Sequence, residues 1–132
     1  MVNEIILGGL IHHIIYDRNL PFNATMFRPN VIIKWENKVN LLLGRNSINE
    51  GIIGIGYDIS ILSHPTLGSI NLKTGAYLQD EAKFEKLGVI TPLGCDIVPI
   101  LGVEFNIPYN DYWGVTTTIT PAIAFTGIYF RF

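Results

Sequence analysis

A chain of 132 residues that is 48% hydrophobic and only 15% charged has an excess of apolar side chains that must face something other than water. Nine Lys and Arg against eleven Asp and Glu give a net charge of −2 without a basic cluster, which argues against a nucleic-acid partner. Gly, Pro, Asn or a charged residue interrupts every apolar run before it reaches the roughly 18 to 20 residues of a membrane-spanning helix. A membrane protein with this sequence must therefore be a β-barrel.

Short segments rich in β-branched and aromatic residues, bounded by turn signals, predict eight strands. In chain order we expect them at 3–16, 27–35, 38–44, 52–62, 67–77, 96–107, 112–120 and 122–132. A short helix is expected only at 79–86, inside the longest connection. The predicted fold is all-β: one domain, residues 1–132, forming an eight-stranded antiparallel up-and-down β-barrel.

The connections between these strands alternate in length, which is typical of barrels with long loops at one end and tight turns at the other. The long connections cover 17–26, 45–51 and 78–95, and the tight ones 36–37, 63–65 and 108–111. The last connection at the long-loop end, around Thr120 and Pro121, is short and departs from the pattern. The final strand, which ends in Phe130-Arg131-Phe132, is expected to pair with the first strand.

The strands alternate between a bulky apolar face and a small, polar, charged face. The apolar face includes Ile53, Ile55, Tyr57, Ile59, Ile61, Phe105 and Phe130, and the polar face Lys34, Gly54, Gly56, Asp58, Lys73, Glu104 and Arg131. The interior of an eight-stranded barrel is just wide enough for its own side chains, so small residues and charge pairs belong inside. We therefore expect the bulky face to contact lipid or detergent.

The alternative is a soluble cytoplasmic barrel with the bulky face inside, which would bind or sequester a small ligand. Crowding argues against it, because isoleucines at every second position of 53–61 leave little room for a ligand. A water-facing row of Gly54 and Gly56 would also weaken that strand.

Candidate chemical residues gather near the long-loop end. A Ser with a His as general base is the minimum arrangement for acyl transfer, so His13, Ser47 and the neighbouring Asn46 are the candidate catalytic residues. The candidate ligand-binding residues are His12, Asp17 and Arg18. The alternative is that the histidines line the interface or the lumen and that Asn46-Ser47 is simply a turn.

No metal or cofactor is expected. No Cys or His pair has the spacing of a metal site, and Gly54-Ile55-Gly56 lacks the third glycine of a dinucleotide site. His64, beside Pro65, is expected to be a solvated turn residue. Tyr109, Tyr112 and Trp113 fit an aromatic girdle at a membrane interface or, equally, ordinary packing of a hairpin.

Several segments, taken in order, resemble the lipid A palmitoyltransferases of Gram-negative outer membranes and their short barrel relatives. They are Tyr16-Asp17, Leu43-Gly44-Arg45-Asn46-Ser47, Gly54-Ile55-Gly56-Tyr57, Leu72-Lys73-Thr74-Gly75-Ala76-Tyr77, Val98-Pro99-Ile100-Leu101, Thr118-Ile119-Thr120-Pro121 and Phe130-Arg131-Phe132. The resemblance implies acyl transfer from a phospholipid to lipid A, with His13 or His12 as the histidine and Ser47 as the serine. It also implies that prolines, here Pro99 and Pro121, open lateral gaps for lipid entry.

One departure from the family puts the activity in doubt, because Asn46 stands where the family has an Asp. An Asn accepts a hydrogen bond but cannot stabilise a developing imidazolium by charge. The expectation is thus a monomeric, lipid-contacting barrel of the outer membrane of a Gram-negative bacterium without an intact catalytic triad, and an active acyltransferase is the alternative. No basic segment or cleavage site follows Met1, which leaves a cytoplasmic location open.

Overall fold

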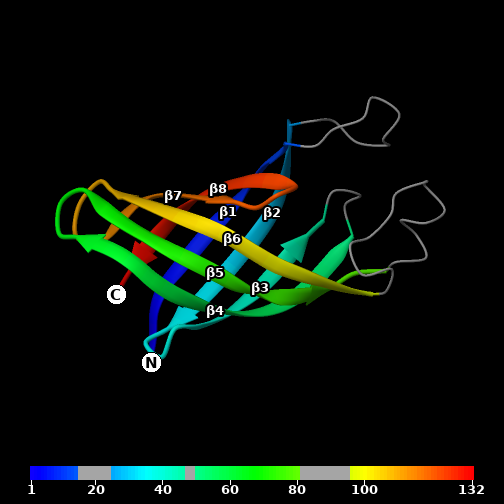
Figure 1. Cartoon of the computed structure of the whole chain (residues 1–132), viewed down its shortest axis with the longest axis horizontal. Coiled ribbons are helices and arrows are strands. Elements are labelled where there is room, and N and C mark those ends of the chain that lie inside the picture. The colour runs from blue at the N-terminus through cyan, green and yellow to red at the C-terminus, as the bar shows by residue number, and fades with distance from the viewer. Residues whose placement is uncertain (15–24, 47–49, 81–95) are drawn as a thin grey trace.

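The computed structural model describes residues 1–14, 25–46, 50–80 and 96–132, which form eight strands (Figure 1). The strands are β1 (Val2–His13), β2 (Thr25–Trp35), β3 (Val39–Arg45), β4 (Gly51–His64), β5 (Gly68–Leu78), β6 (Ile97–Pro108), β7 (Trp113–Ile119) and β8 (Ile123–Arg131). They lie within a few residues of the predicted bounds. Most of the expected helix at 79–86 falls outside the described residues. None of the described segments forms a helix long and apolar enough to cross a membrane.

Each strand pairs with its neighbours in the chain, and β8 closes the barrel on β1. The closing ladder is antiparallel and runs from Glu4 opposite Arg131 to His13 opposite Ile123. The predicted antiparallel up-and-down barrel, including the pairing of the last strand with the first, is confirmed. Closure satisfies the backbone hydrogen bonds of both strands that would otherwise form open edges.

The two ends of the barrel differ as expected from the connection lengths. The tight turns between β2 and β3, β4 and β5, and β6 and β7 lie at the end that also holds both termini, and we call it the turn end (Figure 1). At the opposite end, which we call the loop end, β1, β3 and β5 end and β2, β4 and β6 begin. The β7–β8 connection there is a tight turn at 120–122, in which the Thr120 hydroxyl accepts hydrogen bonds from the backbone N–H groups of Ala122 and Ile123.

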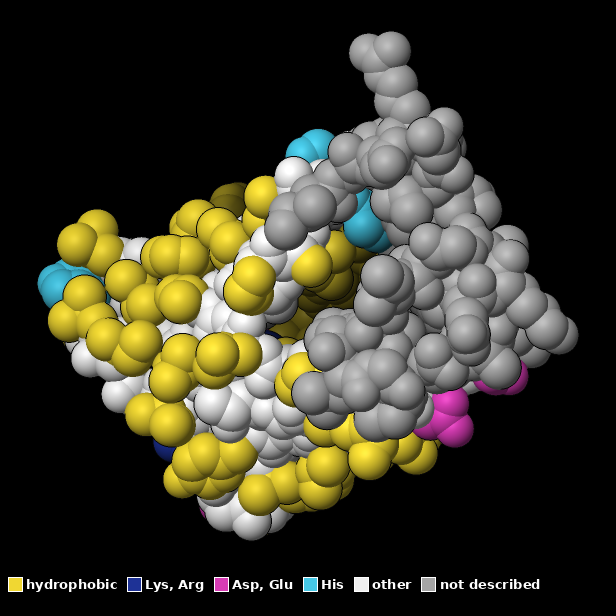
Figure 2. Space-filling model, turned by 45° about the vertical axis from the view of Figure 1, so that its right-hand side comes forward, with side chains coloured by type: hydrophobic (Ala, Val, Ile, Leu, Met, Phe, Trp, Pro, Cys, Tyr) yellow, Lys and Arg dark blue, Asp and Glu magenta, His cyan; other side chains and the backbone are white. Residues whose placement is uncertain are grey.

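Burial confirms which strand face is inside. The charged side chains of Lys34, Asp58, Lys73 and Glu104 are buried in the lumen, whereas Ile55 is 64% exposed on the outside. The visible outer wall is covered with hydrophobic side chains (Figure 2). The outer face of the described strands is therefore mostly apolar, whereas the middle of the lumen is charged.

A β-bulge at Gly9 changes the phase of β1. The β1–β2 ladder shifts register between Gly8 and Leu10, and Gly9 has a φ of +142°. Strict alternation from the inward-facing Ile6 would turn His12 into the lumen, but the bulge instead places His13 there.

The bulge predicts that a side chain in place of Gly9 destabilises the barrel more than one at a glycine outside the bulge. A Cβ added there would lie 1.9 Å from the carbonyl oxygen of Arg28, and the positive φ disfavours any other residue. We expect Gly9→Ala to lower the free energy of unfolding by at least about 2 kcal/mol, measured by urea titration of the refolded protein. Gly51→Ala is the matched control, because a Cβ at Gly51 meets no atom within 4 Å. Equal effects of the two variants would contradict the bulge.

Candidate functional site

Six charged side chains from six strands meet in the middle of the lumen and form what we call the lumen ion cluster. Its members are Glu4 (β1), Lys34 (β2), Asp58 (β4), Lys73 (β5), Glu104 (β6) and Arg131 (β8). Three carboxylates face three cations, so the formal charge of the cluster is zero.

Lys34 is the centre of the cluster. Its ammonium contacts the carboxylate of Glu104, lies 2.7 Å from Asp58 Oδ2 and 3.6 Å from Glu4 Oε1. Lys73 lies 3.2 Å from Asp58 Oδ1 and 3.1 Å from Glu104 Oε2. Buried charges are costly unless they are paired, and each of these charges lies within 4 Å of an opposite charge.

Asparagine side chains complete the hydrogen bonding around the carboxylates. Asn40 donates to Asp58 Oδ1 at 3.0 Å. Asn71 and Asn106 each donate to Glu104 Oε1 at 3.2 Å. Because Asn40 belongs to β3, the polar network ties seven of the eight strands together. Such a network supports the sheet from within.

Above the ion cluster, toward the loop end, the lumen holds an apolar layer. Ile6, Ile32 and Tyr129 are buried together, and Leu42 and Phe125 pack against them. Further toward the loop end, Ile11, Met26 and Val98 are also buried. The alternation along the strands predicted small and polar residues inside, so it did not indicate this apolar upper lumen.

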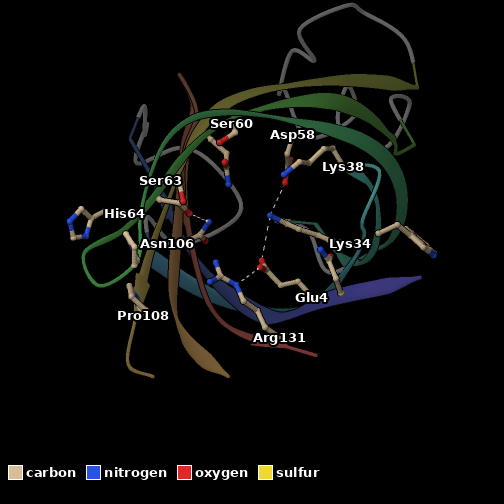
Figure 3. Close-up of a pocket in the computed structure, with 16 residues that line it drawn as sticks. Glu4, Lys34, Lys38, Asp58, Ser60, Ser63, His64, Asn106, Pro108 and Arg131 are labelled. Carbon is tan, nitrogen blue, oxygen red and sulfur yellow. Dashed lines mark hydrogen bonds and ion pairs between the residues drawn. The ribbon is translucent and has the colours of Figure 1, made fainter. Parts of the chain in front are cut away.

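Below the ion cluster, a polar cavity opens at the turn end; we call it the turn-end vestibule (Figure 3). Its volume is about 290 Å³. The lining side chains include Glu4, Lys34, Lys38, Asp58, Ser60, Ser63, Asn106 and Arg131. The lumen thus has three levels, which are polar and open at the turn end, charged and closed in the middle, and apolar toward the loops.

The structure places two of the three candidate catalytic residues. His13 ends β1 with its side chain buried on the lumen side. Asn46 is also buried, and its Oδ1 accepts a hydrogen bond of 2.9 Å from the backbone N–H of Glu50. Because the backbone N–H of Asn46 also donates to the Glu50 carbonyl, this residue closes the connection between β3 and β4. Ser47 lies outside the described residues.

Of the candidate ligand-binding residues, only His12 is described, since Asp17 and Arg18 fall outside the described ranges. His12 is exposed on the outer face, and its Nδ1 lies 2.7 Å from the Thr25 hydroxyl. His12 and His13 therefore face opposite sides of the wall. His64 is exposed at the turn end of β4, where its Nδ1 accepts hydrogen bonds from the backbone of Thr66 and Leu67, as expected of a turn residue.

Two of the ladders stop short toward the loop end and leave prolines beside them. The β2–β3 ladder begins at Asn30, so residues 25–29 of β2, including Pro29, lack partners on β3. The β6–β7 ladder begins at Val103, so residues 97–102 of β6, including Pro99, lack partners on β7. The structure thus places Pro99 next to an interruption of the wall, whereas Pro121 lies in the β7–β8 turn.

Glu4 is the member of the cluster that the sequence analysis did not single out. It lies opposite Lys34 in the β1–β2 ladder and opposite Arg131 in the β1–β8 ladder. The sequence did hold a signal for Glu4, because it lies two residues before Ile6 and therefore on the same inward face of the strand. Among the residues that the structure describes, no group of three His, Cys, Asp or Glu side chains is arranged to hold a metal ion.

A scan against protein-family models, a search of curated proteins and a search of solved structures found no match to this chain.

The ion cluster makes Lys34 far more sensitive to substitution than a lysine at the rim. Lys34→Met leaves three buried carboxylates with one cation fewer, and we expect it to lower the free energy of unfolding by about 3–5 kcal/mol in a urea titration. Lys38→Met, at an exposed turn position, should change it by less than about 0.5 kcal/mol. Adding Asp58→Asn to Lys34→Met should recover part of the loss. Equal effects of the two single variants would contradict the cluster.

Proposed function

We propose that this protein is a lipid-embedded β-barrel of the outer-membrane type. The observation that carries the proposal is the distribution of charge on the outside. Every exposed Asp, Glu, Lys or Arg among the described residues lies in a connection or is the last residue of a strand. They are Glu36, Lys38, Arg45, Asp80, Asp96, Asp111 and Arg131, and the side chain of Arg131 turns into the lumen. Between these two charged ends the wall is an apolar band, as in barrels that span the hydrocarbon region.

The size of this band supports the same function. Exposed large hydrophobic residues occur on all eight strands, and on β4 alone they include Ile53, Ile55, Tyr57, Ile59 and Ile61. A soluble monomer rarely exposes an apolar patch beyond a few hundred Å². Six of the eight strands have nine or more residues, which suits a tilted crossing of about 30 Å of hydrocarbon.

Aromatic residues at the turn end support an interface there. Tyr109 and Tyr112 are more than 70% exposed, and Tyr109 stacks on Trp113 with ring centroids 4.5 Å apart. Aromatic rings are favoured at the boundary between hydrocarbon and water. In outer-membrane barrels the tight turns face the periplasm, so the proposal directs this end inward and the long connections outward.

The described residues support lipid contact more than catalysis. The Asn46 side chain is engaged in closing its own loop, which favours a structural use of this position over the orientation of a histidine. The apolar upper lumen and the interrupted ladders beside Pro29 and Pro99 fit contact with acyl chains. The proposed function is therefore that of a lipid-contacting barrel, as the family resemblance suggests, without acyl transfer.

Lysine substitution on the outer wall tests this function. Ile55 is 64% exposed within the apolar band, and Leu67 is 77% exposed in the β4–β5 turn. For protein folded in phospholipid vesicles, we expect Ile55→Lys to lower the free energy of unfolding by about 2–4 kcal/mol and Leu67→Lys by at most about 1 kcal/mol. If the wall faced water, both variants would stay within about 0.5 kcal/mol of the parent chain. That result would overturn the proposal.

A further inference from the structure

The turn-end vestibule has hydrogen-bond donors left over. The carboxylates at its inner end are all engaged, since Glu4 contacts Lys34 and Arg131 while Asp58 contacts Lys34 and Lys73. Lys38 lines the same cavity and makes no ion pair among the described residues. Because the lumen ion cluster is neutral, Lys38 gives the vestibule a net positive charge.

Arg131 presents the best-placed of these donors. Its Nε donates to Glu4 Oε2 at 3.1 Å, and its guanidinium lies over the Tyr129 ring at 4.7 Å from the centroid. These two contacts fix the plane of the group, but both Nη atoms have no hydrogen-bond partner among the described residues. The Arg131 side chain is 42% exposed and lies toward the open cavity (Figure 3). A guanidinium held in this way matches the two oxygens of a carboxylate or phosphate.

Hydroxyl groups on the opposite wall add uncharged donors. Ser60 and Ser63 of β4 line the vestibule, and their hydroxyls form no hydrogen bond with any described residue. A cavity of about 290 Å³ has room for roughly ten waters or for a small molecule with an oxyanion group. The unused donors are thus cations and hydroxyls, whereas the acidic groups are paired with cations and the unpaired amide oxygen of Asn106 is buried.

From these observations we propose that the turn-end vestibule is a binding site for a small oxyanion, a carboxylate or phosphate group held by the Nη atoms of Arg131. Lys38 at the rim contributes long-range attraction, and the serine hydroxyls donate hydrogen bonds to the remaining oxygens of the oxyanion. The site lies inside the barrel wall, so the proposal does not depend on what surrounds the outside.

The test is an NMR titration of the ¹⁵N-labelled full chain, followed at the Arg131 Nε–H signal, in zwitterionic detergent or, if the chain is soluble, in buffer. The probes are inorganic phosphate and acetate, each compared with sodium chloride at equal ionic strength. We expect a saturable shift with phosphate, acetate or both and none with chloride. The Arg131→Lys variant keeps the positive charge that pairs with Glu4 but removes the two Nη donors of the guanidinium. Its affinity for the oxyanion should therefore fall at least tenfold.

Arg45→Lys is the matched control, since Arg45 is an exposed arginine at the opposite end of the barrel. The Arg45→Lys variant should bind the probe with the affinity of the parent chain. For both the Arg45→Lys and the Arg131→Lys variants, the affinity is measured from the backbone NMR signals near Ser60 and Ser63. Three results would overturn the proposal: no saturable shift with either oxyanion, an equal shift with chloride, or equal affinities for the Arg131→Lys and Arg45→Lys variants. The first would mean that the vestibule holds water only.

Discussion

The contact of the Lys34 ammonium with carboxylates from β1, β4 and β6 is the interaction on which the rest of the structure depends. Each of these charges would be expensive to bury alone, and together they cancel. A narrow eight-stranded barrel has room for this cluster and little else at its middle. Because the polar side chains satisfy one another inside, the alternate positions of the same strands are left to be apolar on the outside.

The ion cluster also divides the lumen into two different spaces. On one side, Ile6, Ile32 and Tyr129 form an apolar layer, and Ile11, Met26 and Val98 are buried further toward the loop end. On the other, the vestibule is polar and open, and Arg131 connects it to the cluster. The apolar band outside and the apolar upper lumen are separated only by the strand wall, which is interrupted beside Pro29 and Pro99. In the lipid-embedded barrel that we propose, only this wall would separate acyl chains from the inside of the barrel.

The alternation of apolar and polar residues was enough to predict the strands, the closed barrel and the inward-facing charges. Alternation specifies the face of each residue, because a shift of one residue would turn every side chain of a strand to the wrong face. It could not predict the bulge, since a glycine such as Gly9 permits an irregular backbone without requiring one. It also missed Glu4, whose role appears only when Lys34 and Arg131 flank it across two ladders. The candidate site was harder, because Ser47, Asp17 and Arg18 belong to long connections, in which periodicity carries no signal.

The central claim is that the outer face of the strands contacts lipid. Single spin labels placed at 53, 55 and 57 of β4, in a Cys95→Ser background and in phospholipid vesicles, test it directly by their accessibility to oxygen and to a water-soluble nickel complex. A lipid-facing wall predicts strong oxygen accessibility and weak nickel accessibility at all three positions. Strong nickel accessibility at 53, 55 and 57 would show that this face meets water and would contradict the account.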